Sequence, residues 1–112
     1  MRTLFTPRST VAYPHEPLSL PTQFRGKIVV DTDLCRGCGA CARDCPADGL
    51  AVERLEQGGF RLLHYRDRCA HCGQCETSCR FGALRLVNAY TPPSFTRQEL
   101  FEVLVCHDEK ER

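Results

Sequence analysis

Residues 35–46 read Cys35-Arg36-Gly37-Cys38-Gly39-Ala40-Cys41-Ala42-Arg43-Asp44-Cys45-Pro46. The same cysteine spacing returns 34 residues later as Cys69-Ala70-His71-Cys72-Gly73-Gln74-Cys75-Glu76-Thr77-Ser78-Cys79. Three cysteines separated by two residues can share one tight loop, and the glycines among them permit sharp turns and close backbone approach. This regular spacing indicates thiolate ligands for a metal group rather than cysteines that only fill a core.

The spacing of both runs resembles that of bacterial ferredoxins. A cubane cluster has four irons, and each iron needs one thiolate. One loop can cap three corners, whereas the fourth corner faces away from it. In proteins of this type the last cysteine ligates the other cluster. The resemblance therefore implies two [4Fe–4S] clusters, cluster 1 held by Cys35, Cys38, Cys41 and Cys79, and cluster 2 held by Cys69, Cys72, Cys75 and Cys45.

Clustered cysteines can also bind zinc or form disulfides. Zinc sites also use C-x-x-C pairs, but two zinc sites need only four pairs, and each run here has three close cysteines plus one. Disulfides are typical of secreted proteins, and the N-terminus lacks the apolar segment of a signal peptide. We therefore expect a cytoplasmic chain with reduced thiols, and iron–sulfur clusters rather than zinc or disulfides.

The internal repeat predicts the fold. A shift of 34 residues also superposes Asp33 on Asp67, Gly39 on Gly73 and Leu50 on Leu84. Each unit contains a short strand, a cysteine loop, a short helix around the last two cysteines and a second strand. The strands are expected over residues 28–30, 50–52, 62–64 and 84–87. We predict an α+β fold of the two-[4Fe–4S] ferredoxin type, with a pseudo-twofold βαβ–βαβ repeat.

Composition divides the chain into three regions. Residues 1–26 form an arm with four prolines, which disfavour helix and favour extended chain, yet the arm also carries several large apolar residues. We expect it to lie against its own domain or a neighbour. Residues 27–90 form the ferredoxin domain. Residues 91–112 begin with Thr91-Pro92-Pro93, and Thr96 with Glu99 fits a capping box, so they predict a short docking helix and a charged tail.

Charge and hydropathy exclude some functions. The 112 residues have a formal net charge of +1, and no basic run or acidic tail indicates binding to nucleic acid. No apolar run approaches the ~20 residues of a membrane span. No nucleophile–base pair or phosphate loop is visible either. We expect a non-catalytic electron-transfer protein without an active site of its own.

A second resemblance comes from the arm. The motif Tyr13-Pro14-His15-Glu16-Pro17, followed by Phe24-Arg25-Gly26-Lys27, resembles the two-cluster iron–sulfur subunit of complex I and of membrane-bound [NiFe] hydrogenases such as formate hydrogenlyase. The resemblance implies an electron-relay subunit. Its partners would be other iron–sulfur and catalytic subunits on the cytoplasmic side of a membrane, with only indirect membrane contact.

The short spacing of 24 positions between Cys45 and Cys69, and the short chain, favour the hydrogenase-type branch over the NADH-quinone oxidoreductase type. A free, diffusing ferredoxin is the other alternative. Such proteins are usually acidic and little longer than their repeats, whereas residues 27–90 carry nine basic and eight acidic side chains and have long flanks.

Three residues stand apart from this pattern. Arg80 follows the last cysteine of the second run, where the family usually has proline, and we expect its positive charge to raise the potential of the cluster bound by Cys79. Cys106 has no place in either run and is interpreted as a buried apolar residue on the C-terminal helix. His71 lies inside the second run, as a peripheral residue or as one that tunes the cluster.

Overall fold

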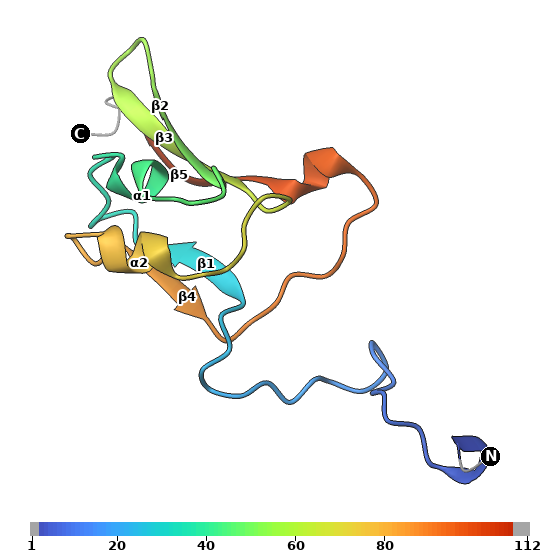
Figure 1. Ribbon diagram of the computed structural model, residues 1–112. Helices are drawn as coiled ribbons and strands as arrows, with labels where there is room; N and C mark the ends of the chain where they lie inside the picture. The colour runs from blue at the N-terminus through green and yellow to red at the C-terminus, as the bar shows by residue number, and fades with distance from the viewer. Residues whose placement is uncertain (1–2, 109–112) are drawn as a thin grey trace.

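The structure is a computed structural model that describes residues 3–108. Residues 27–90, the predicted ferredoxin domain, have the element order β1, α1, β2, β3, α2, β4, and a further strand, β5, follows them (Figure 1). The bounds are β1 Lys27–Val30, α1 Ala40–Arg43, β2 Leu50–Arg54, β3 Gly59–Tyr65, α2 Gln74–Ser78, β4 Leu84–Val87 and β5 Phe101–Asp108. Two 3₁₀ turns, η1 over Thr3–Phe5 and η2 over Arg97–Leu100, complete the described elements. The strands and short helices of both repeat units lie where the sequence predicts them.

The strands form two small antiparallel sheets. β1 pairs with β4, so the first strand of one repeat meets the last strand of the other. β2 and β3 form a hairpin whose turn contains Gly58 at a φ of 80°, and β5 adds to the outer edge of β3. The helices α1 and α2 lie side by side next to these sheets (Figure 1). None of the helices described between residues 3 and 108 is long and apolar enough to span a membrane.

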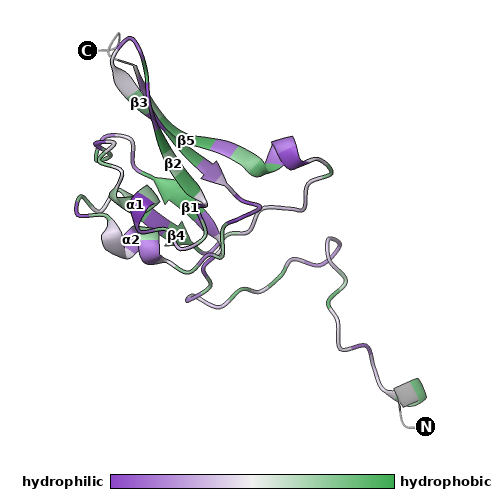
Figure 2. Cartoon of the chain, turned by 45° about the horizontal axis from the view of Figure 1, so that its top comes forward, coloured by the Kyte–Doolittle hydropathy of each residue, from purple (hydrophilic) through white to green (hydrophobic). Residues whose placement is uncertain are grey.

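The core is narrow and lies between the sheets and the cysteine loops. Its buried members include Ile28, Leu50, Leu62, Leu84 and Val105, together with Cys41 and Cys75. In Figure 2 the strands are mostly green, or hydrophobic, whereas the short helices and turns carry the purple, hydrophilic residues. Helices of four and five residues do not persist alone, so α1 and α2 depend on this packing.

The predicted C-terminal helix is wrong, because residues Phe101–Asp108 form strand β5. Thr96 makes no side-chain cap, and the Glu99 carboxylate accepts instead from the Phe95 N–H at 3.3 Å. The segment then becomes extended because β3 offers a free edge of backbone donors and acceptors. Val103 and Val105 suit such a pleated position. Leu62 faces Val105 and Leu63 faces Val103, so a bulge at this point leaves one extra residue in β5.

The N-terminal arm runs away from the sheets (Figure 1). Its last part is anchored, since the Gly26 N–H donates to the Val87 carbonyl at 3.2 Å, and the Asn88 amide donates to the Leu20 carbonyl at 3.4 Å. Tyr13 meets the ring of Tyr90 edge-on, with centroids 5.5 Å apart. The Cα radius of gyration is 18.0 Å, against about 13 Å expected for a compact chain of this length. The projecting arm accounts for the elongated shape.

Candidate metal centres

The eight repeated cysteines gather around two separate hollows. Cys35, Cys38 and Cys41 line one hollow together with Cys79 from the second run. The other hollow is lined by Cys69, Cys72, Cys75 and, from the first run, Cys45. Each group therefore joins three thiols from one loop to the last cysteine of the other repeat. The ferredoxin resemblance implied the same two groups as ligand sets, and their binding of clusters stays a prediction.

The remaining walls of both hollows are mainly apolar and come from matching positions of the repeat. Ile28, Leu50 and Leu86 line the Cys69 hollow, whereas Leu62, Leu84 and Val52 line the Cys35 hollow. Within residues 3–108, no three His, Cys, Asp or Glu side chains are arranged to hold a single metal ion. A [4Fe–4S] cluster spreads four thiolates over four irons, and four soft thiol donors around a largely apolar hollow fit that group.

The backbone of the two loops repeats its geometry. Gly39 and Gly73, which directly precede α1 and α2, both have left-handed φ values, 77° and 84°. Gly37, at 61°, matches His71, at 50°. At Gly37 the need for glycine is also steric, because an added Cβ would lie 2.5 Å from the Phe60 ring. These turns direct backbone towards the hollows.

Each last cysteine receives a backbone hydrogen bond at the same place in the repeat. The Gly49 N–H donates to Cys45 Sγ at 3.2 Å, and the Ala83 N–H donates to Cys79 Sγ at 3.3 Å. Hydrogen bonds to cluster sulfur atoms stabilise negative charge and raise the reduction potential. The structure thus supplies one such donor to each of the two predicted crossing ligands.

An arginine holds each cysteine loop from outside the loop. Arg54 Nη2 on β2 donates to the Gly37 carbonyl at 3.0 Å. Arg25 Nη1 in the arm donates to the Cys72 carbonyl at 2.6 Å and passes beside Gly73. No sequence pattern indicates either contact, because the partners lie 17 and 47 positions apart. Both place a positive charge next to a ligand loop.

Burial raises the pKa of four of the eight thiols and so favours their protonated form. It raises the pKa of Cys41 and of Cys75 to about 11. Burial also raises the pKa of Cys35 and Cys69. Burial also acts to raise the pKa of Cys79. Hydrogen bonds from backbone N–H groups, led by that of Ala83, outweigh this effect and lower the pKa of Cys79. Cluster ligands must be thiolates, so binding releases protons from these residues.

The three residues outside the pattern occupy different places. Cys106 is exposed on β5, so its predicted burial on a helix is wrong. His71 lines the hollow of the second run, and its Nδ1 is buried without a hydrogen-bond partner. Arg80 is exposed, and its effect on the potential stays a prediction.

The fold and the thiol geometry together resemble those of a two-cluster ferredoxin. Residues 34–83 match the family model of the 4Fe-4S dicluster domain, which confirms the predicted cofactors, two [4Fe–4S] clusters. NADH-quinone oxidoreductase subunit I 1 of Nitrosococcus oceani is 36% identical over 58 residues, covering 47% of this chain and 32% of that protein. NADH-quinone oxidoreductase subunit I of Yersinia pestis (strain Pestoides F) is 38% identical over 58 residues, which again cover 47% of this chain and 32% of that protein.

A solved structure matches more of the chain. It is the structure of the membrane-bound sulfane sulfur reductase, an archaeal respiratory membrane complex, and one of its chains superposes with a TM-score of 0.63 at 28% identity. The match covers 88% of this chain and 53% of that chain. The predicted resemblance to a ferredoxin-type subunit of complex I-like assemblies is confirmed. The chain spans about a third of the length of the curated relatives it matches.

Proposed function

We propose that this chain relays single electrons through its two clusters within a complex I-like, membrane-associated oxidoreductase. A bound cluster supplies the redox chemistry by taking up and releasing one electron. The protein's own residues fix the position of each cluster, shield it with apolar side chains and set its electrostatic surroundings.

The observation that carries the proposal is the pair of four-thiol hollows, each completed by a cysteine of the other repeat. We assign Cys35, Cys38, Cys41 and Cys79 as ligands of cluster 1, and Cys69, Cys72, Cys75 and Cys45 as ligands of cluster 2. This exchange, with the matched φ values and matched N–H···S bonds, supports a pseudo-twofold arrangement of the two units. Two clusters that share ligands between the repeats favour an electron relay over a purely structural role, because one cluster would be enough to stabilise the fold.

The arm supports a role as a subunit. Leu4 and Phe5 expose 76% and 93% of their surface, and Val11 exposes 52%, on a segment that leaves its own domain. Exposed apolar residues in such number mark an interaction surface. We infer that the arm packs between partner subunits, other iron–sulfur and catalytic proteins, on the cytoplasmic side of the membrane. Contact with the membrane itself would be indirect.

The identity of the assembly is a separate question. The spacing of the cysteine runs favours a hydrogenase-type complex. The relatives named above are subunits of an NADH-quinone oxidoreductase and a chain from a sulfane sulfur reductase complex. An electron relay through two clusters is compatible with each of these assemblies, and experiment must identify the terminal partners.

An anaerobic affinity purification from the native host, with the co-eluting proteins identified by mass spectrometry, tests the relay role. We expect a complex with membrane subunits and a catalytic subunit whose identity names the branch. Deletion of residues 3–19 is the matched variant, and it should abolish co-elution while both cluster signals persist. Recovery of the intact chain as a soluble two-cluster monomer would instead establish a free ferredoxin.

A further inference from the structure

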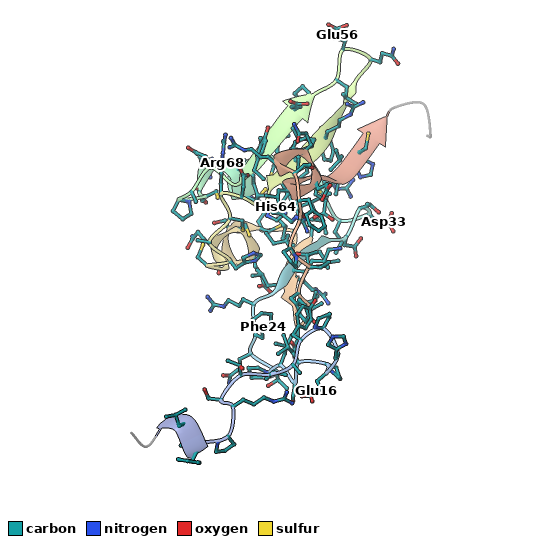
Figure 3. The ribbon with its side chains drawn as sticks, turned by 90° about the vertical axis from the view of Figure 1, so that its right-hand side faces the viewer. Glu16, Phe24, Asp33, Glu56, His64 and Arg68 are labelled. Carbon is teal, nitrogen blue, oxygen red and sulfur yellow. The ribbon has the colours of Figure 1, made fainter. Side chains whose placement is uncertain are left out.

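His64 is an ionisable side chain buried in the middle of the folded region (Figure 3). It exposes only 2% of its surface, and neither ring nitrogen has a hydrogen-bond partner. A buried polar group without a partner destabilises the fold, and a function that needs the imidazole would account for its presence. A leucine would fill this strand position without that cost.

Four charged or titratable groups surround His64. Glu102 on β5 lies directly across the sheet from it, with Oε2 3.9 Å from His64 Nδ1. Lys27 on β1 reaches the other oxygen of the same carboxylate at 3.6 Å. Arg66, near the end of β3, and His71, in the second cysteine loop, also act on His64 electrostatically. Glu102 is one-third exposed and therefore connects the buried ring to solvent.

His64 is also next to the hollow of cluster 2. On its other side in the sheet it pairs with Leu50, and Leu50 lines that hollow. His71 lines the same hollow and is close enough for its charge to disfavour a charge on His64. A charge gained inside the hollow would therefore act on His64 through a buried, poorly screened region.

We propose that His64 is a redox-linked proton site for cluster 2. When one electron arrives on the cluster from its donor, one negative charge is added, and His64 binds one proton that enters from solvent past Glu102. When the electron leaves, the same proton is released. One electron and one proton move together, no bond of the cluster changes, and the net charge of the buried region stays constant. The inference deepens the proposed relay and rests on its assignment of cluster 2.

The direction of the pH dependence follows from the surroundings of His64. Burial lowers its pKa below the usual value and so favours the neutral ring, whereas the Glu102 carboxylate acts to raise it. The electron raises that pKa. His64 therefore has a lower pKa when the cluster is oxidised and a higher pKa when it is reduced. Between these two pKa values the potential of cluster 2 falls as pH rises. Below the lower pKa the ring is always charged, and above the higher one it is always neutral, so the potential is flat in both ranges.

The test is an EPR-monitored redox titration of the 112-residue chain with both clusters assembled, repeated across the pH range. For a one-electron couple a tenfold change in proton concentration corresponds to roughly 59 mV, so the slope should approach that value per pH unit at cluster 2. It should be near zero at cluster 1. The variant His64→Leu should abolish the slope. His107→Asn is the matched control, because His107 lies on the same sheet but donates to the Thr32 carbonyl at 2.6 Å.

Two further variants keep the outcome decisive if His64→Leu fails to assemble its clusters. Glu102→Gln should move the sloping range to lower pH, because the carboxylate that raises the pKa of His64 is gone. His71→Asn should retain the slope. A slope that survives in His64→Leu, or that is unchanged in Glu102→Gln, would overturn the proposal, as would loss of the slope in His71→Asn alone. Absence of partner subunits in the affinity purification would count against the relay role. It would not change the pH dependence measured in the redox titration.

Discussion

Arg25 and Arg54 hold the two cysteine loops in equivalent ways, one for each cluster. A positive charge favours the reduced cluster, because reduction adds negative charge. Arg25→Ala should therefore lower the potential of cluster 2, and Arg54→Ala that of cluster 1. An exposed charge contributes under about 1 kcal/mol, which is on the order of 20–40 mV for one electron.

Each arginine variant serves as the control for the other in EPR-monitored titrations at low salt. The interaction is partly exposed, so the shift should shrink as ionic strength rises. If either variant moved both potentials equally, the effect would come from a general loss of structure rather than from the local charge.

Residues differ in how far the sequence predicts their role. The eight cysteines were predicted as ligands from their spacing and its resemblance to ferredoxins, and the structure gathers them around two hollows. Arg25 and His64 could not, because their roles arise from contacts that form only when distant segments meet. His71 shows a mixed case. Its place in the loop was evident, but its left-handed backbone became evident only beside Gly37 in the structure.

Strand β5 is the element that the sequence misassigned. Its apolar residues fit a short helix as well as a strand, since a run of this length does not distinguish the two periods. In the structure this segment pairs with the edge of β3 that β2 leaves open. That edge exists only after the sheet has formed, so a local sequence pattern does not indicate it. The four strands of the repeat were predicted because the repeat itself supplied a second, independent copy of each pattern.

Two valines of β5 provide a test of this assignment. Val105 exposes 2% of its surface, whereas Val103, two positions away, exposes 47%. Val105→Ala should lower the free energy of unfolding by about 2 kcal/mol, from lost burial and a residual cavity. Val103→Ala should change it by less than about 0.5 kcal/mol. Anaerobic denaturation followed through the cluster absorbance measures both, and equal effects would contradict the register of β5.

At the scale of the whole molecule, the crossing cysteines join the repeats into one body. β1 pairs with β4 across the repeats, and Cys45 and Cys79 each reach the hollow of the other unit. A core this narrow gains stability from the metal, because ligation free energy adds to folding free energy. Cluster binding and tertiary structure should therefore be lost together when the iron is removed.

The exchange of ligands makes a prediction that paired variants can test. If Cys45 and the second loop hold the same cluster, Cys45→Ala and Cys72→Ala both remove a ligand of cluster 2. The double variant should then lose cluster 2 and retain cluster 1. Cys45→Ala combined with Cys38→Ala should lose both, because the two residues then belong to different clusters. Without the exchange the two double variants would give the opposite results. Iron and sulfide content with EPR distinguishes them, and Cys106→Ala, which lies outside both hollows, should keep both clusters.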